Sequence, residues 1–67
     1  MPWNSGYFPH SMVNLPAVTR EKAIEIANAL LAQGYEEGRA IRIAITQAKR
    51  WANSHARDHE VDRDLMD

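Results

Sequence analysis

Two histidines in the second half of the chain have a spacing that metal sites use. His55 and His59 are four residues apart, and on a helix this spacing places both imidazoles on one face. The nearby oxygen donors are Asp58, Glu60 and Asp62. Val61 is the only apolar residue between positions 57 and 64, so the segment lacks the packed surroundings that hold metal ligands in place. We therefore expect a solvated tail here and no metal site.

Motifs for covalent or phosphate chemistry are also missing from the sequence. No serine stands in the Gly-x-Ser-x-Gly turn of a hydrolase nucleophile. Gly34 and Gly38 are not followed by the Gly-Lys-Ser/Thr of a phosphate loop. Pro2 becomes a terminal amine if Met1 is removed, as in the tautomerase family, but residues 3–6 have the composition of a turn and not of a β-strand. We expect a protein that is not an enzyme and holds no cofactor.

A row of basic and polar residues in the second half is the best lead to a function. The row consists of Arg39, Arg42, Thr46, Lys49, Arg50 and Asn53. On a helix these residues share one side, and their side chains can donate hydrogen bonds to phosphates and base edges. The isoelectric point near 6.3 is far from that of a basic nucleic-acid domain. Two interpretations stay open: a solvated helix face, or a site for a polyanion or an acidic partner.

Apolar residues recur with a helical period in two segments, residues 16–33 and about 37–55. In the first segment they fall within an arc of about 160°. The residues opposite this arc are Glu21, Glu25 and Asn28. Pro16 suits the start of a helix, and Gly34 suits its end because the residue after a helix often needs a positive φ.

The second segment carries an alanine at each turn of its inner face. These alanines are Ala40, Ala44, Ala48 and Ala52. Small side chains let the first helix approach closely, and the short connection 34–36 turns the chain back. We predict an antiparallel two-helix hairpin, and we attribute the early Gly38 to close approach of another backbone.

The first fifteen residues form an arm that is uncharged and rich in aromatic residues. Because disordered tails have the opposite composition, we expect the arm to lie across the hairpin as an irregular segment with one helical turn near residues 11–14. Its aromatic residues Trp3, Tyr7 and Phe8 either complete the core or form an exposed patch that docks a partner. The fold class is therefore all-α.

The charges divide the chain into three parts. Residues 1–19 carry no charged side chain, residues 20–57 sum to +3, and residues 58–67 sum to −4. We predict one small helical domain over residues 1–56 and a flexible acidic tail over 57–67. The longest apolar run is four residues, so no membrane span is expected. The lack of cysteine fits a reducing compartment, and we expect a cytoplasmic protein.

Several segments resemble a family of small uncharacterised bacterial proteins. They are the Met-Pro-Trp start, Tyr7-Phe8-Pro9, the run from Lys22 to Leu31, Gly34-Tyr35 and the run from Gln47 to Ala52. The resemblance covers about residues 1–53. It implies a link to general stress, because in some members a similar segment precedes a second domain in stress proteins. A more remote similarity, to the ChaB family of cation-transport regulators, rests on the Met-Pro start and the Leu-Pro step.

Together these features predict a non-enzymatic interaction module with an unidentified protein partner and, from the resemblance, a stress-related role. The alternative is weak nucleic-acid binding through the basic side of the second helix. We expect no membrane partner, and a homodimer through an incompletely covered helix face stays open.

Overall fold

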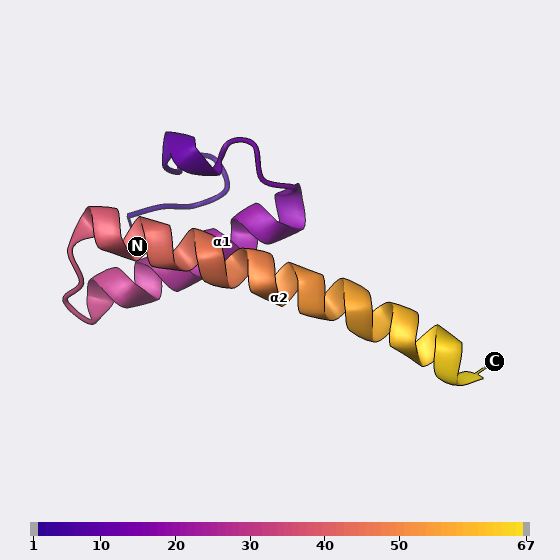
Figure 1. Cartoon of the computed structure of the whole chain (residues 1–67). Coiled ribbons are helices and arrows are strands. Elements are labelled where there is room, and N and C mark those ends of the chain that lie inside the picture. Colours follow the sequence, from indigo (N-terminus) through magenta and orange to yellow (C-terminus); the bar gives the residue numbers. More distant parts are fainter. Residues whose placement is uncertain (1, 67) are drawn as a thin grey trace.

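A computed structural model describes the backbone of residues 2–66 and the side chains of residues 2–54. Its elements are a short 3₁₀ helix η1 (His10–Met12) and two α-helices, α1 (Ala17–Ala32) and α2 (Glu37–Met66). Helices α1 and α2 pack against each other as a hairpin, and the N-terminal arm returns across it (Figure 1). The all-α hairpin and the helical turn in the arm are confirmed.

Helix α2 continues past residue 55, where the sequence predicted its end. The apolar period ends there, but the end of an apolar stripe does not by itself stop a helix. The flexible acidic tail predicted for residues 57–67 lies outside the residues whose side chains are described, so it stays a prediction. None of the described helices combines the length and apolar character that crossing a bilayer requires.

Helix α1 begins and ends at residues suited to these positions. Pro16 precedes the helix with φ −55° and ψ 150°, and its carbonyl accepts the Arg20 N–H at 2.8 Å. At the other end Gly34 has a φ of +99°. The Gly34 N–H then donates to the Leu31 carbonyl at 3.0 Å and the Tyr35 N–H to the Leu30 carbonyl at 3.1 Å, the Schellman arrangement. This turn points α2 back along α1.

The start of α2 is capped by the residue in front of it. The Glu36 carboxylate accepts the Arg39 N–H at 3.1 Å, so it satisfies one of the free donors of the first turn. A methyl group built at Gly38 would meet only this carboxylate, at 3.4 Å. No other backbone lies against Gly38 among the described residues, so our explanation of this glycine was wrong.

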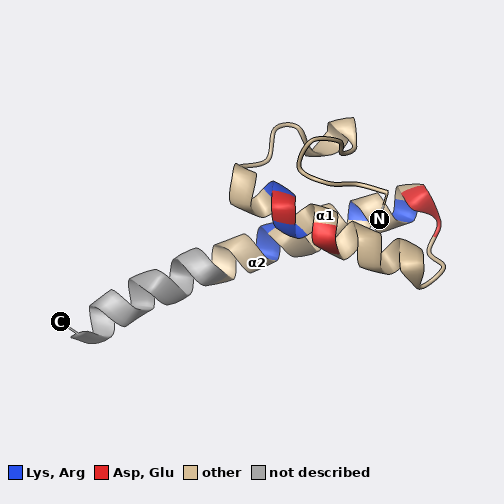
Figure 2. Ribbon diagram, turned by 180° about the vertical axis from the view of Figure 1, so that it is seen from behind, with Lys and Arg blue, Asp and Glu red and all other residues tan. Residues whose placement is uncertain are grey.

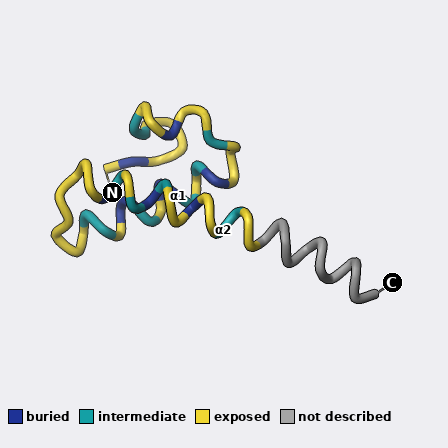
Figure 3. The backbone as a smooth tube through the Cα atoms, viewed as in Figure 1, coloured by how far each residue is buried: buried dark blue, intermediate teal, exposed yellow. Residues whose placement is uncertain are grey.

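The core lies where the arm and both helices meet (Figure 3). Ala40, Ala44 and Ala48 are fully buried, as the alanine pattern predicted. The buried cluster consists of Trp3, Met12, Ala23, Ile24, Ala27, Ala44 and Ala48. Because alanines supply little volume, the large side chains of the arm fill the remaining space. The arm is therefore part of the core.

One arginine of α1 holds the middle of the arm. The Arg20 guanidinium lies 4.9 Å from the centroid of the Phe8 ring, and its Nη1 donates to the Leu15 carbonyl at 3.2 Å. A cation over an aromatic face is stabilising by about 0.5–1 kcal/mol at exposed sites. Arg20 thus connects α1 to both ends of the segment that contains η1.

Candidate functional site

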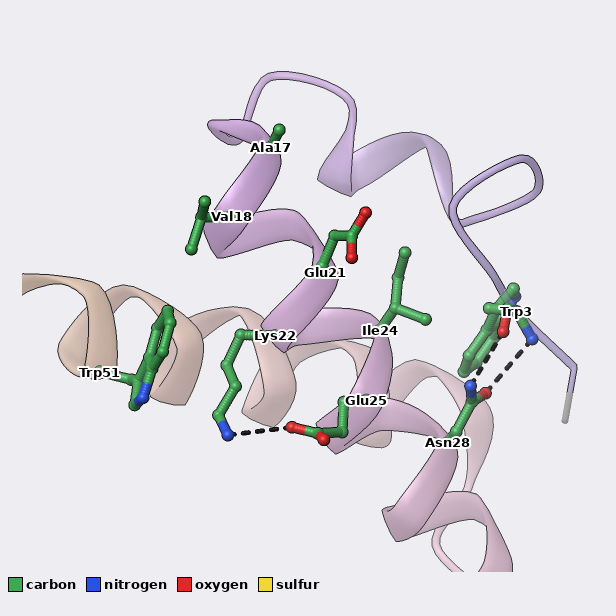
Figure 4. A pocket seen from close by; sticks show the side chains of 9 residues that line it. All are labelled: Trp3, Ala17, Val18, Glu21, Lys22, Ile24, Glu25, Asn28 and Trp51. Carbon is green, nitrogen blue, oxygen red and sulfur yellow. Dashed lines mark hydrogen bonds and ion pairs between the residues drawn. The ribbon is translucent and has the colours of Figure 1, made fainter.

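Asn28 joins α1 to the start of the arm (Figure 4). Its Oδ1 accepts the Trp3 N–H at 3.2 Å, and its Nδ2 donates to the Trp3 carbonyl at 2.9 Å. Only 6% of Asn28 is exposed, although the helical period places it opposite the apolar arc of α1. The arm covers this side of α1, and the helical period could not indicate a covering segment 25 residues away.

The same region contains a surface hollow (Figure 4). Its lining residues are Trp3, Ala17, Val18, Glu21, Lys22, Ile24, Glu25, Asn28 and Trp51. The Lys22 Nζ lies 2.9 Å from a Glu25 carboxylate oxygen and 5.3 Å from the centroid of the Trp51 ring. The Glu25 side chain is 70% exposed, so this ion pair is a solvated contact worth about 0–1 kcal/mol. Lys22 and Trp51 join the two helices across the hollow.

The described residues provide no cluster of three or more His, Cys, Asp and Glu side chains that could hold a metal ion. His55 and His59 lie outside the residues whose side chains are described, as do the three nearby acidic residues. The solvated tail that we expect in place of a metal site therefore stays a prediction.

The six residues of the predicted row are all exposed on α2. They are Arg39, Arg42, Thr46, Lys49, Arg50 and Asn53. Ala40, Ala44 and Ala48 of α2 are buried, whereas the helical period places the row on the opposite side of the helix. Figure 2 marks the positions of the charged residues along both helices. We call this row the basic face. Within residues 2–54 none of its four cations forms an ion pair, and residues 38–54 contain no carboxylate.

The three aromatic residues of the arm have different surroundings. Trp3 is buried in the core with 6% exposed, and Phe8 is half-buried beneath Arg20. Tyr7 is 68% exposed, in a turn where Asn4 and Tyr7 exchange backbone hydrogen bonds of 2.8 and 3.1 Å. Docking through these rings stays a prediction, and Tyr7 is the most exposed of the three residues.

The fold and its basic face define a small helical-hairpin domain with an exposed cationic helix. The chain is 52% identical over 62 residues to the uncharacterized protein YdaT of Bacillus subtilis (strain 168). The match covers 92% of this chain and 41% of that relative. This similarity supports the resemblance to uncharacterised bacterial proteins. No family model matches the chain, and no solved structure matches it.

Proposed function

We propose that this chain is a non-enzymatic interaction domain that binds an acidic partner protein through the basic face of α2. The observation that carries the proposal is the exposure of Arg39, Arg42, Lys49 and Arg50 without a carboxylate partner among residues 2–54. Arginine presents a planar fork of donors that matches a carboxylate, so such groups favour acidic partners.

The arrangement of the cations adds a physical reason for an anionic partner. Arg39 and Arg42 are three residues apart and Lys49 and Arg50 are adjacent. Like charges three or four residues apart on a helix repel each other by a few tenths of a kcal/mol, so the Arg39–Arg42 pair is destabilising. An acidic surface that docks on the face relieves this repulsion and adds charge-assisted hydrogen bonds.

Nucleic acid is the alternative partner for the same face. The donors of Thr46 and Asn53, together with the cations, can also contact phosphates and base edges. The whole chain has a net charge of −1, however, whereas domains that bind nucleic acid are typically strongly basic. We therefore place an acidic protein first.

A binding titration tests the proposal. The probes are a fluorescent peptide of about 20 residues rich in Glu and Ala, and a duplex DNA of about 20 base pairs, each followed by anisotropy at low salt. We expect the unchanged protein to bind the peptide with micromolar affinity. The double variant Arg42→Gln/Arg50→Gln should bind it at least about tenfold more weakly. Tighter binding of the DNA, or no binding of the peptide, overturns the proposal.

The control variant changes the net charge equally at other positions. Ser5→Glu/Val18→Glu also lowers the charge by two, and both residues are exposed outside the basic face. Since it leaves the face intact, we expect it to bind the peptide within about twofold of the unchanged protein. An equal loss in both double variants means that total charge, and not the face, determines binding.

The resemblance to general-stress proteins supports a setting for this function. We propose that the domain acts in the bacterial cytoplasm, where the absence of cysteine is compatible with reducing conditions. Growth of a deletion strain under salt, heat and ethanol stress, compared with its parent, tests the link. Equal survival of both strains contradicts it.

A further inference from the structure

We infer that the basic face recognises a partner helix with one apolar side chain flanked by carboxylates four residues before and four residues after it. This inference rests on the proposed function and specifies the partner. It starts from a shallow hollow on α2 that is separate from the hollow of Figure 4. The lining residues are Arg42, Ile43, Thr46, Gln47 and Arg50.

The hollow follows two neighbouring rows of side chains along α2. Arg42, Thr46 and Arg50 are spaced by four residues and form one ridge, while Ile43 and Gln47 form the next. The space between two such ridges is the groove into which the ridge of another helix packs. The hollow therefore has the shape that a helix recognises.

The floor of the groove contains an isoleucine that the domain itself leaves without a core contact. Ile41 and Ile45 pack against the buried cluster, whereas Ile43 is half-buried and does not. A partner that places an apolar side chain over Ile43 removes its exposed surface from water, at about 25 cal/mol per Å². A phosphate backbone offers no such group, so the groove favours a helix over nucleic acid.

The two arginines set the positions of the acidic residues. Arg42 and Arg50 are eight residues apart, which is about 12 Å along a helix. Carboxylates at the first and ninth positions of a partner ridge are separated by the same distance, with the fifth position between them. The partner pattern is therefore acidic-x₃-apolar-x₃-acidic, which pairs both carboxylates with guanidinium groups and places the apolar side chain in the groove between Thr46 and the neighbouring ridge of Ile43 and Gln47.

Two peptides of identical composition test this pattern. In the first, Glu residues stand four positions before and after a Leu within a helical peptide of about 18 residues; in the second, they stand two positions before and after it, on the opposite side of the helix. We expect the first peptide to bind at least about fivefold more tightly to the full chain, by fluorescence anisotropy. Equal affinities overturn the inference.

Single variants of the protein complete the test. Arg42→Gln and Arg50→Gln are each expected to weaken binding of the first peptide about tenfold. Ile43→Ser is expected to weaken the same binding about threefold or more. Lys49→Gln removes the same charge at a residue outside the hollow. We expect it to weaken binding of the first peptide by less than about threefold. Ile43→Val keeps an apolar floor and restores binding if the serine variant is merely unstable. Far-UV circular dichroism checks that each variant keeps its helices.

The outcomes separate this inference from the proposed function. Suppose that Lys49→Gln weakens peptide binding as much as Arg50→Gln does while acidic peptides still bind. The basic face is then a general anion site, and only the proposed spacing of the partner's acidic and apolar residues is wrong. If no acidic peptide binds, both proposals fail. A mass measurement by sedimentation that shows a dimer abolished by Arg50→Gln replaces the partner helix with a second copy of this chain.

Discussion

Asn28 shows how one amide side chain can hold a segment that has no regular structure. The asparagine amide carries N–H donors and a carbonyl acceptor side by side in one plane, so it can pair with both backbone groups of Trp3. The backbone of a buried irregular segment must find such partners, because an unpaired N–H or C=O away from water is costly. The side chain therefore substitutes for a neighbouring strand.

Replacing Asn28 removes both of its hydrogen bonds to the backbone of Trp3 at once. We expect Asn28→Ala to lower the free energy of unfolding by about 2–3 kcal/mol, because two buried backbone groups lose their hydrogen bonds. Urea unfolding followed by circular dichroism measures the change. The control Asn53→Ala removes an exposed amide and should change stability by less than about 0.5 kcal/mol. Similar losses in both variants contradict the role of Asn28.

Single residues were the least predictable part of the molecule. Buried positions on α2 followed from the period, because each alanine repeats at the spacing of the helix. Asn28 did not follow, because its burial depends on the path of an arm with no period of its own. Trp3, Tyr7 and Phe8 were treated alike for the same reason, although the structure buries Trp3 and exposes Tyr7.

The two helices and the turn between them were predictable from local features. The predicted bounds 16–33 match those of α1 within one residue, since Pro16 and Gly34 act through their own backbone geometry. The end of α2 was not predictable, because no Gly or Pro follows residue 38. The basic face was predictable from the sequence, because it shares the period of the helix. Its groove around Ile43 was missed.

The two glycines near the hairpin turn should respond oppositely to alanine. Gly34→Ala is expected to lower the free energy of unfolding by about 1–2 kcal/mol, because a residue with a side chain is strained at φ +99°. Gly38→Ala is expected to stabilise α2 by about 0.5–1 kcal/mol, because it restricts the unfolded chain and meets only the end of the Glu36 side chain. Thermal unfolding of the two variants shows whether each substitution raises or lowers stability. A loss of stability in Gly38→Ala means that this position needs glycine.

At the scale of the whole molecule, the residues that pack the core and the charged residues of the basic face lie on different sides of α2. The arm and both helices meet in an uncharged core, whereas the residues of the basic face of α2 are exposed. The one ion pair among residues 2–54, Lys22–Glu25, is exposed. The fold is therefore maintained by burial of apolar groups, while the charges are available for binding.

This separation predicts different responses to salt. Raising NaCl from about 0.05 to 0.5 M shortens the range of charge interactions from about 14 to 4 Å. We expect the free energy of unfolding to change by less than about 0.5 kcal/mol, whereas binding of the acidic peptide should weaken at least about tenfold. Urea unfolding and anisotropy at both concentrations measure the two effects. Binding that does not respond to salt is incompatible with recognition by charge.

The alanine-lined contact between the helices has a consequence for the order in which the domain can form. The largest fully buried side chain is Met12, in the arm, and it is enclosed together with Ala44 and Ala48 of α2. A ribosome makes the arm first and these alanines much later. During synthesis Met12 and Trp3 therefore stay without their α2 neighbours until Ala44 and Ala48 have left the exit tunnel, and the core can close only after that point.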